Sequence, residues 1–182
     1  TITQPATVVS SSSTQTNVNC NGASTGAIDL TAQGGTEAGT YDYSWVNDAN
    51  AGVVIATTED LTGLAAGSYT CTITDDNSCT TTEAVTITQL AAIATASSSQ
   101  TNVLCRTAST GAATISVSGG NGVYTYTWTG SNSTTATASN LAAGTYVVSV
   151  VDGHSCPDDG DITFTITQPA TVVSSSSTQT NV

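Results

Sequence analysis

Residues 41–45 read Tyr-Asp-Tyr-Ser-Trp, and residues 124–128 read Tyr-Thr-Tyr-Thr-Trp. In both stretches a large aromatic side chain alternates with a small or acidic one. Because successive side chains of a β-strand point to opposite faces, this alternation predicts a strand with one buried aromatic face and one exposed polar face. The core residues that this pattern predicts are Tyr43, Trp45, Tyr126 and Trp128.

Shorter alternating runs, rich in Thr, Val, Ser and Tyr, fill the rest of each half. No stretch shows the 3.6-residue apolar stripe of a helix, and only short turns fit between the runs. This pattern predicts an all-β chain folded as antiparallel sandwiches. The further predicted strands are 27–32, 53–57, 69–74 and 83–89 in the first half, and 112–117, 135–138, 146–151 and 161–168 in the second.

The chain repeats itself on two scales. Residues 1–18 return letter for letter as residues 165–182, which gives a period of 165 − 1 = 164 residues. Inside this period the second half repeats the first, as when Thr-Ile-Thr-Gln at 1–4 returns at 86–89. Each half is long enough to close a small core of its own. We therefore expect one period of a longer tandem array, with domains at 6–89 and 90–168, the last-strand or linker remnant of a preceding repeat at 1–5, and the first strand of the next repeat at 169–182.

A turn motif also occurs in both halves. Residues 64–69 read Leu-Ala-Ala-Gly-Ser-Tyr, and residues 141–146 read Leu-Ala-Ala-Gly-Thr-Tyr. The motif resembles the turn and tyrosine that open strand F of immunoglobulin-like domains, where the tyrosine hydroxyl bonds back to the upstream backbone. We expect Tyr69 and Tyr146 to be structural core residues of tandem immunoglobulin-like sandwiches. The alternative is an ordinary buried tyrosine at a hairpin.

Four of the five cysteines occupy equivalent positions in the two halves, and the fifth has no equivalent. The internal repeat aligns Cys20 with Cys105 and Cys79 with Cys156, whereas Cys71 aligns with a valine. If both domains share one framework, the cysteine left over is a free thiol in the core. Two alternatives stay open: a Cys20–Cys71 bridge, and a fully reduced chain as in the cytosol. The predicted disulfides are Cys20–Cys79 and Cys105–Cys156, with Cys71 as the free thiol.

The charge balance restricts the partners. One basic residue, Arg106, stands against 13 acidic residues, for a formal net charge of −12. Phosphate binding needs Lys and Arg, so nucleic acid is excluded as a partner, and an anionic membrane surface is equally unfavourable. No apolar run is long enough to span a bilayer, and no signal sequence is visible. We expect an extracellular or cell-surface location.

A set of motifs recurs in the same order in both halves and covers nearly the whole chain. Together they resemble the SprB-type repeat of Bacteroidota cell-surface and gliding adhesins. The resemblance implies secreted, surface-attached, repetitive proteins that form long filaments or stalks. In the first half the motifs are Ile-Thr-Gln-Pro at 2–5, Val-Asn-Cys-Asn-Gly at 18–22, Thr-Gly-Ala-Ile at 25–28, Gly-Gly at 34–35, the stretches 41–45 and 64–69, and Asp-Asp-Asn-Ser-Cys at 75–79.

Residues that catalyse reactions or hold cofactors are scarce. The single histidine, His154, takes the place of Asn77 in an Asp-x-x-Ser-Cys turn, and no nucleophile, base and orienting partner accompany it. Neither zinc-ligand spacing nor a phosphate loop is present. We therefore expect a protein that is not an enzyme and that needs no cofactor.

Calcium is the one weak cofactor candidate. Acidic clusters on probable turns carry the oxygen ligands that calcium prefers, but neither has the spacing of a known calcium loop, and solvated turn carboxylates are the simpler interpretation. The sequon Asn132-Ser-Thr is a candidate glycosylation site in a polar loop. The calcium candidates are Asp75, Asp76, Asp158, Asp159 and Asp161.

These observations predict a structural subunit or periodic segment of an extracellular filament or adhesin stalk. Its partners would be identical copies of itself, joined by covalent tandem repetition or by strand exchange. The alternative is a module that binds cell-surface polysaccharide, with Tyr124, Tyr126 and Trp128 as a stacking platform.

Overall fold

The computed structural model describes residues 8–35, 40–50, 52–171, 176 and 179. The chain divides into two compact units, residues 1–91 and 92–182, called unit 1 and unit 2. The all-β, immunoglobulin-like fold class is confirmed. The assignment of residues 1–5 to a preceding repeat lies outside the described residues, and that of 169–182 to the next repeat lies largely outside them, so both stay predictions.

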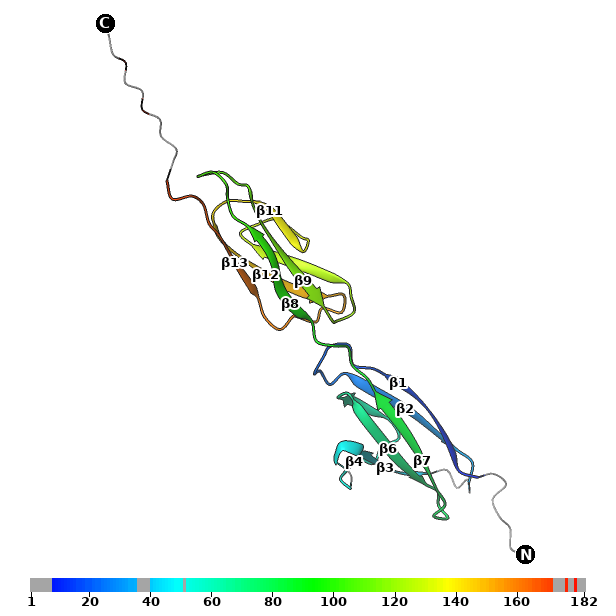
Figure 1. Cartoon of the computed structure of the whole chain (residues 1–182). Coiled ribbons are helices and arrows are strands. Elements are labelled where there is room, and N and C mark those ends of the chain that lie inside the picture. The colour runs from blue at the N-terminus through cyan, green and yellow to red at the C-terminus, as the bar shows by residue number, and fades with distance from the viewer. Residues whose placement is uncertain (1–7, 36–39, 51, 172–175, 177–178, 180–182) are drawn as a thin grey trace, which may run out of the picture. The chain divides into compact units, whose positions relative to one another are not determined.

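Unit 1 is a sandwich of a three-stranded and a four-stranded antiparallel sheet. In Figure 1 the blue strands β1 and β2 belong to one layer, and the cyan to green strands β3, β6 and β7 belong to the other. A short 3-10 turn, η1 (Asp48–Asn50), follows β3. The first sheet has the order β1 (Ser10–Thr16), β2 (Gly26–Gln33), β5 (Leu61–Leu64), and the second has the order β4 (Val54–Ala56), β3 (Asp42–Asn47), β6 (Gly67–Thr74), β7 (Thr80–Ile87).

Unit 2 repeats this plan with two three-stranded sheets. Among its described residues no strand corresponds to β4. One sheet has the order β11 (Thr137–Leu141), β9 (Gly111–Ser118), β8 (Ala94–Thr101), and the other has the order β10 (Tyr124–Thr129), β12 (Gly144–Asp152), β13 (Ile162–Ile166).

Each unit has its own core, built by the alternation that the sequence shows. In β6, Tyr69, Cys71 and Ile73 are buried, and Cys71 pairs across the sheet with the fully buried Trp45 of β3. The indole N–H of Trp45 donates to the carbonyl oxygen of Thr58 at 3.0 Å, so burial leaves this donor satisfied. In unit 2 the corresponding buried residues are Tyr146, Val148, Val150 and Trp128. Tyr43 and Tyr126 are half-buried and pack against the two cores.

The structure contains three strands that the apolar alternation does not predict. Two of them, β1 and β8, are rich in Ser and Thr and expose most of their side chains, so they carry little apolar alternation. The third, β5, has only four residues. Pairing with β2 and β9 holds these strands in place, and that pairing is a tertiary effect.

In each unit the first and last strands run in the same direction. Val18 forms a parallel bridge with Gln89, and its N–H donates to the carbonyl oxygen of Thr88 at 2.9 Å. In unit 2 the N–H of Val103 donates to the carbonyl oxygen of Thr167 at 2.9 Å. The chain therefore enters each unit at one end of the sandwich, its N-terminal pole, and leaves at the other end, its C-terminal pole.

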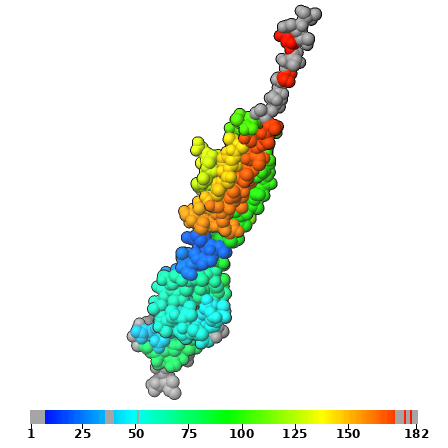
Figure 2. Space-filling model, turned by 90° about the vertical axis from the view of Figure 1, so that its left-hand side faces the viewer, coloured from blue at the N-terminus to red at the C-terminus, as the bar shows by residue number. Residues whose placement is uncertain are grey.

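No described helix is long and apolar enough to cross a membrane. On the face that Figure 2 shows, the described residues of each unit form a closed surface without a deep cleft.

Candidate functional site

An aspartate organises the turn at the N-terminal pole of unit 1. Asp75 is only 4% exposed, and its Oδ1 accepts the backbone N–H groups of Asn77 at 3.0 Å and Cys79 at 2.8 Å. The backbone N–H of Asp75 donates to the carbonyl oxygen of Cys79 at 3.0 Å. Ser78 adopts the left-handed conformation, with φ of 64°. This network holds Cys79 in a defined position at the end of the sandwich.

Unit 2 has the same turn. Oδ1 of Asp152 accepts the N–H groups of His154 at 2.9 Å and Cys156 at 3.0 Å, and Oδ2 accepts that of Asn121 at 3.1 Å. Burial acts to raise the pKa of Asp152, but these three backbone donors outweigh it and hold the pKa below its ordinary value. His154 thus contributes its backbone to the turn, as the sequence predicts for a turn residue.

In each unit a glycine packs between the turn aspartate and an apolar residue near the start of the unit. A Cβ placed on Gly35 would lie 2.7 Å from Oδ2 of Asp75 and 2.6 Å from Cγ2 of Val9. A Cβ on Gly120 would lie 2.8 Å from Oδ2 of Asp152 and 2.9 Å from Cγ1 of Ile93. Both glycines have positive φ, so only glycine fits this packing. Cys79 and Cys156 are therefore at the N-terminal poles, where the chain enters.

The other cysteine of each unit lies at the C-terminal pole. The N–H of Gly22 donates to Oε1 of Gln89 at 2.7 Å, which ties the Cys20 loop to the residues that follow β7. The N–H of Thr107 donates to Oε1 of Gln168 at 2.9 Å and ties the Cys105 loop to the residues that follow β13. Thr107 has φ of 63° where Gly22 has 74°, so the turn survives the replacement of glycine.

Neither predicted disulfide is formed. Cys79 and Cys105 are free and exposed thiols, so the Cys20–Cys79 and Cys105–Cys156 pairings are wrong. The partners lie at opposite poles, separated by the eight residues of β7 or the nine of β12, which span about 26 Å and 30 Å. A disulfide requires Cα atoms within about 7 Å. Cys20 and Cys156 are disulfide-bonded, so the fully reduced alternative is also wrong.

Cys71 is a free thiol inside the core of unit 1. Because Cys71 is free, the alternative Cys20–Cys71 bridge is wrong. The thiol is fully buried, and burial raises its pKa. A protonated, inaccessible thiol is a poor nucleophile. Its role is to fill the position that Val148 fills in unit 2.

The aromatic strand of unit 2 does not offer a stacking platform. Trp128 is only 5% exposed, its ring lies 5.8 Å from that of Phe164, and its indole N–H donates to the carbonyl oxygen of Thr135. The Tyr124 hydroxyl donates to the carbonyl oxygen of Gly119 at 2.6 Å, and burial raises the pKa of Tyr126. Trp128 is committed to the interior, and Tyr124 and Tyr126 are half-buried against the core, so the three rings do not form one exposed stacking face.

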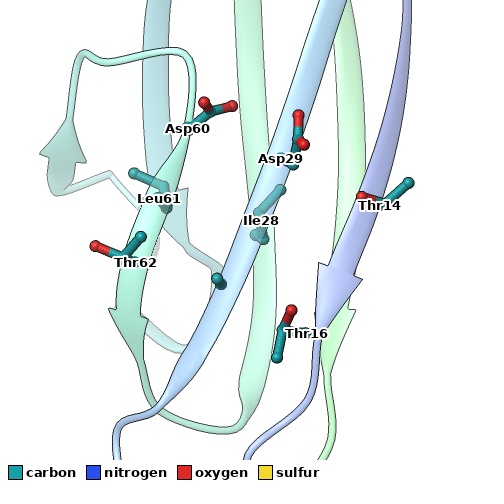
Figure 3. A pocket seen from close by; sticks show the side chains of 8 residues that line it. Thr14, Thr16, Ile28, Asp29, Asp60, Leu61 and Thr62 are labelled. Carbon is teal, nitrogen blue, oxygen red and sulfur yellow. The ribbon is translucent and has the colours of Figure 1, made fainter.

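A shallow cavity of about 260 Å³ opens on the β1-β2-β5 sheet of unit 1 (Figure 3). Its walls offer threonine hydroxyls and the carboxylates of Asp29 and Asp60, but no aromatic ring. Asp60 Oδ1 is already engaged by the N–H of Leu30 at 3.0 Å. At the matching positions of β9 and β11, unit 2 has Thr114 and Thr137, bonded to each other, so the cavity is not a feature of the repeat. The lining residues are Thr14, Thr16, Ala27, Ile28, Asp29, Asp60, Leu61 and Thr62.

The calcium candidates do not converge. Across the described residues no three His, Cys, Asp or Glu side chains gather in a way that could hold a metal ion. Asp76 accepts a hydrogen bond from the Thr40 hydroxyl at 3.2 Å. Oδ2 of Asp158 is buried without a hydrogen-bond partner, while Asp159 and Asp161 are exposed. Calcium binding therefore stays a prediction, as does glycosylation of the exposed Asn132.

Comparison with known proteins finds a family match in both units. The sequence model of the SprB repeat matches residues 12–50 of unit 1 and residues 97–133 of unit 2. Each unit thus contains a stretch that is similar to the SprB repeat. The two SprB matches begin within β1 and β8, the serine-rich strands, and run through the aromatic strands β3 and β10. No match to a curated protein was found.

Among solved structures the chain is similar to the three N-terminal domains of the outer capsid protein Hoc of bacteriophage RB49, with 17% identity and a TM-score of 0.51. The alignment covers 88% of this chain and 59% of that one. The N-terminal eight immunoglobulin domains of the cell adhesion molecule DSCAM align with 11% identity and a TM-score of 0.46, over 90% of this chain and 25% of that one. The chain thus spans less than two thirds of either structure. The Hoc likeness shows the fold alone.

The SprB repeat is a feature of cell-surface adhesins. The two matches support an extracellular, adhesin-like repeat module.

Proposed function

We propose that this chain is a load-bearing periodic segment of an extracellular filament or adhesin stalk, in which it is joined to identical copies of itself. The observation that carries the proposal is the parallel pairing of the first and last strands in each unit. The N–H of Val18 donates to Thr88, and that of Val103 donates to Thr167. The chain therefore enters and leaves each unit at opposite poles, as a bead strung in series requires.

This arrangement loads hydrogen bonds in shear. Tension on the two chain ends pulls β1 and β7 along their length in opposite directions, so the bonds between them are stretched together instead of opening one at a time. The Val18 bond is reinforced by the N–H of Thr88, which donates to Oδ1 of Asn17 at 2.9 Å. In unit 2 the N–H of Thr167 donates to Oδ1 of Asn102 at 3.0 Å. We call each set of two bonds the terminal clamp.

Further polar contacts extend the terminal clamp along β1. The hydroxyls of Ser11 and Ser13 donate to the two carboxylate oxygens of Glu83 in β7, at 2.9 and 2.7 Å. In unit 2 the Gln100 side chain donates to the carbonyl oxygen of Thr165 at 3.2 Å. The Ser- and Thr-rich composition of the first strands thus has a structural role, because short hydroxyl side chains join the outermost strand to its neighbour.

Single-molecule force spectroscopy tests the load-bearing role. With Cys20, Cys105 and Cys156 replaced by serine and reductant present, Cys79 is the one exposed thiol among the described cysteines. Unit 1 is then pulled either between its chain ends, which shears the terminal clamp, or between the start of β1 and Cys79, which lie at the same pole, so that β1 is peeled away. The expected result is a clearly higher rupture force in the first geometry. Equal forces would refute a load-bearing clamp.

The connection between copies needs its own measurement. Denaturing electrophoresis under reducing conditions separates the two routes, since covalent tandem repetition gives a single band of high mass, whereas strand exchange gives a band near the 18.1 kDa of this chain. Electron microscopy of the same material is expected to show filaments. Dispersed single particles, with and without reductant, would overturn the proposed assembly of copies into filaments.

A further inference from the structure

The two free, exposed cysteines have disulfide-bonded counterparts. Cys79 and Cys156 are the equivalent cysteines of the N-terminal poles, and Cys20 and Cys105 are those of the C-terminal poles. In each set one member is disulfide-bonded and the other is a free thiol on the surface. The free ones are Cys79 at the N-terminal pole of unit 1 and Cys105 at the C-terminal pole of unit 2. The two free thiols are thus at the poles that would meet neighbouring copies.

The free thiols lie on turns and loops held by the same hydrogen bonds as those of their bonded counterparts. The Asp75 carboxylate holds the Cys79 turn as Asp152 holds the Cys156 turn, with N–H to Oδ1 distances of 2.8 and 3.0 Å. The Cys105 loop is tied to Gln168 as the Cys20 loop is tied to Gln89. The fold therefore holds the backbone around all four pole cysteines in the same way. The free Cys79 and Cys105 differ in being exposed, whereas the bonded Cys156 is buried.

The repeat places the free thiols opposite each other in a row of copies. The identity of residues 1–18 with residues 165–182 means that, in register, the equivalent of Val9 follows Gln168 by five residues. Five residues reach at most about 18 Å. The C-terminal pole of one copy, which carries Cys105, is thereby tethered close to the N-terminal pole of the next copy, which carries Cys79.

We propose that Cys105 of one copy and Cys79 of the following copy form a disulfide, so that every junction between successive copies is stapled covalently. The inference rests on the proposed function, because it requires copies in series. A staple at each junction would keep the poles from separating under tension even where strand contacts yield.

The oxidation needs an electron acceptor, which we assign to a low-molecular-weight disulfide. The thiolate of one cysteine attacks the donor disulfide, forms a mixed disulfide and releases one donor thiolate. The thiolate of the second cysteine then displaces the remaining donor thiolate. The protein loses two protons and two electrons, and the donor disulfide is reduced to two thiols.

The test uses two copies in one chain, residues 1–164 followed by residues 1–182, refolded in oxidised and reduced glutathione. Without the staple the two copies carry six free thiols, twice the three of one chain, and the staple lowers the number to four. Thiol counting after denaturation measures this difference. Peptide mapping identifies the bond, with an aspartate- or aromatic-specific protease because the chain has a single basic residue.

Matched variants use the same substitutions in the two copies. Cys105→Ser in the first copy or Cys79→Ser in the second is expected to abolish the staple. The same substitutions at the outer ends, Cys79→Ser in the first copy and Cys105→Ser in the second, are expected to leave it intact. A Cys79–Cys79 or Cys105–Cys105 link, or six free thiols while Cys20 and Cys156 are oxidised, would overturn the proposal. The force measurement above, made with reductant, tests the proposed function independently.

Discussion

The backbone N–H of Val18 and the carbonyl oxygen of Thr88 lie 2.9 Å apart and join the first and last strands of unit 1 in parallel. This one relationship sends the chain out of the sandwich at the pole opposite to the one where it entered. The distribution of the cysteines and the proposed response to tension both follow from it.

The side chain of Asn17 is expected to strengthen the terminal clamp. Asn17→Ala removes the acceptor of the Thr88 N–H and should lower the free energy of unfolding by about 1 kcal/mol. It should also lower the rupture force between the chain ends. The matched control is Asn47→Ala, which removes an acceptor from the N–H of Ala49 outside the terminal clamp. The control should leave the force unchanged. Equal losses of force in both variants would contradict a special role of Asn17.

The two tyrosine corners are expected to contribute equally and independently. The hydroxyls of Tyr69 and Tyr146 donate to the carbonyl oxygens of Ala65 at 2.9 Å and Ala142 at 3.0 Å. Tyr69→Phe and Tyr146→Phe should each cost about 1 kcal/mol, measured by urea unfolding. Because the substitutions fall in different units, each should destabilise only its own unit. An unchanged free energy of unfolding in both variants would show that the tyrosine ring, and not its hydroxyl, contributes to stability.

Thiol reactivity should separate the free cysteines. In the folded chain a maleimide should modify Cys79 and Cys105, which are exposed, and spare Cys71, which is buried and whose pKa burial raises. Cys71 should react only after denaturation. Cys71→Val, which copies Val148, should change the free energy of unfolding by less than about 1.5 kcal/mol and leave the labelling of the folded chain unaltered. Rapid modification of Cys71 in the folded chain would contradict its burial.

Unit 2 should lose stability in acid through Asp152. Its backbone donors hold the folded-state pKa below the unfolded value of about 3.9, so the unfolded state binds more protons as the pH falls. The contribution of Asp152 to the stability of unit 2 is complete above the unfolded-state pKa and is lost as the pH falls through the folded-state pKa. Thermal unfolding between neutral and strongly acidic pH measures it. Asp152→Asn should be less stable at neutral pH and flatten the profile, whereas Asp159→Asn, at an exposed position, should do neither.

Removal of calcium is expected to leave stability unchanged. The Asp75 carboxylate already accepts the N–H groups of Asn77 and Cys79, and the described acidic side chains form no group of ligands. A chelator should therefore not shift the unfolding temperature. A lower unfolding temperature in chelator, restored by added calcium, would show that a calcium site exists, with Asp158 as the first residue to substitute.

Side-chain chemistry predicted most of the fold and part of the pole structure. The alternation in 41–45 and 124–128 leads directly to β3 and β10, and the Leu-Ala-Ala-Gly turns precede the tyrosines whose hydroxyls bond back to the chain. Strands β1 and β8 escape such analysis because their side chains are mostly exposed, so no apolar period marks them. The capping role of Asp152 was missed for a related reason, since one aspartate in a polar turn resembles any other.

By itself the sequence determined that this protein is a repeat of β-sandwiches and which cysteines are equivalent, because apolar alternation and internal identity are properties of the chain alone. Only the tertiary structure decided which cysteines can meet. Cys20 and Cys79 belong to one sandwich, yet β7 holds them at opposite poles, and the order of strands that sets this separation is a property of hydrogen-bonded neighbours far apart in the chain.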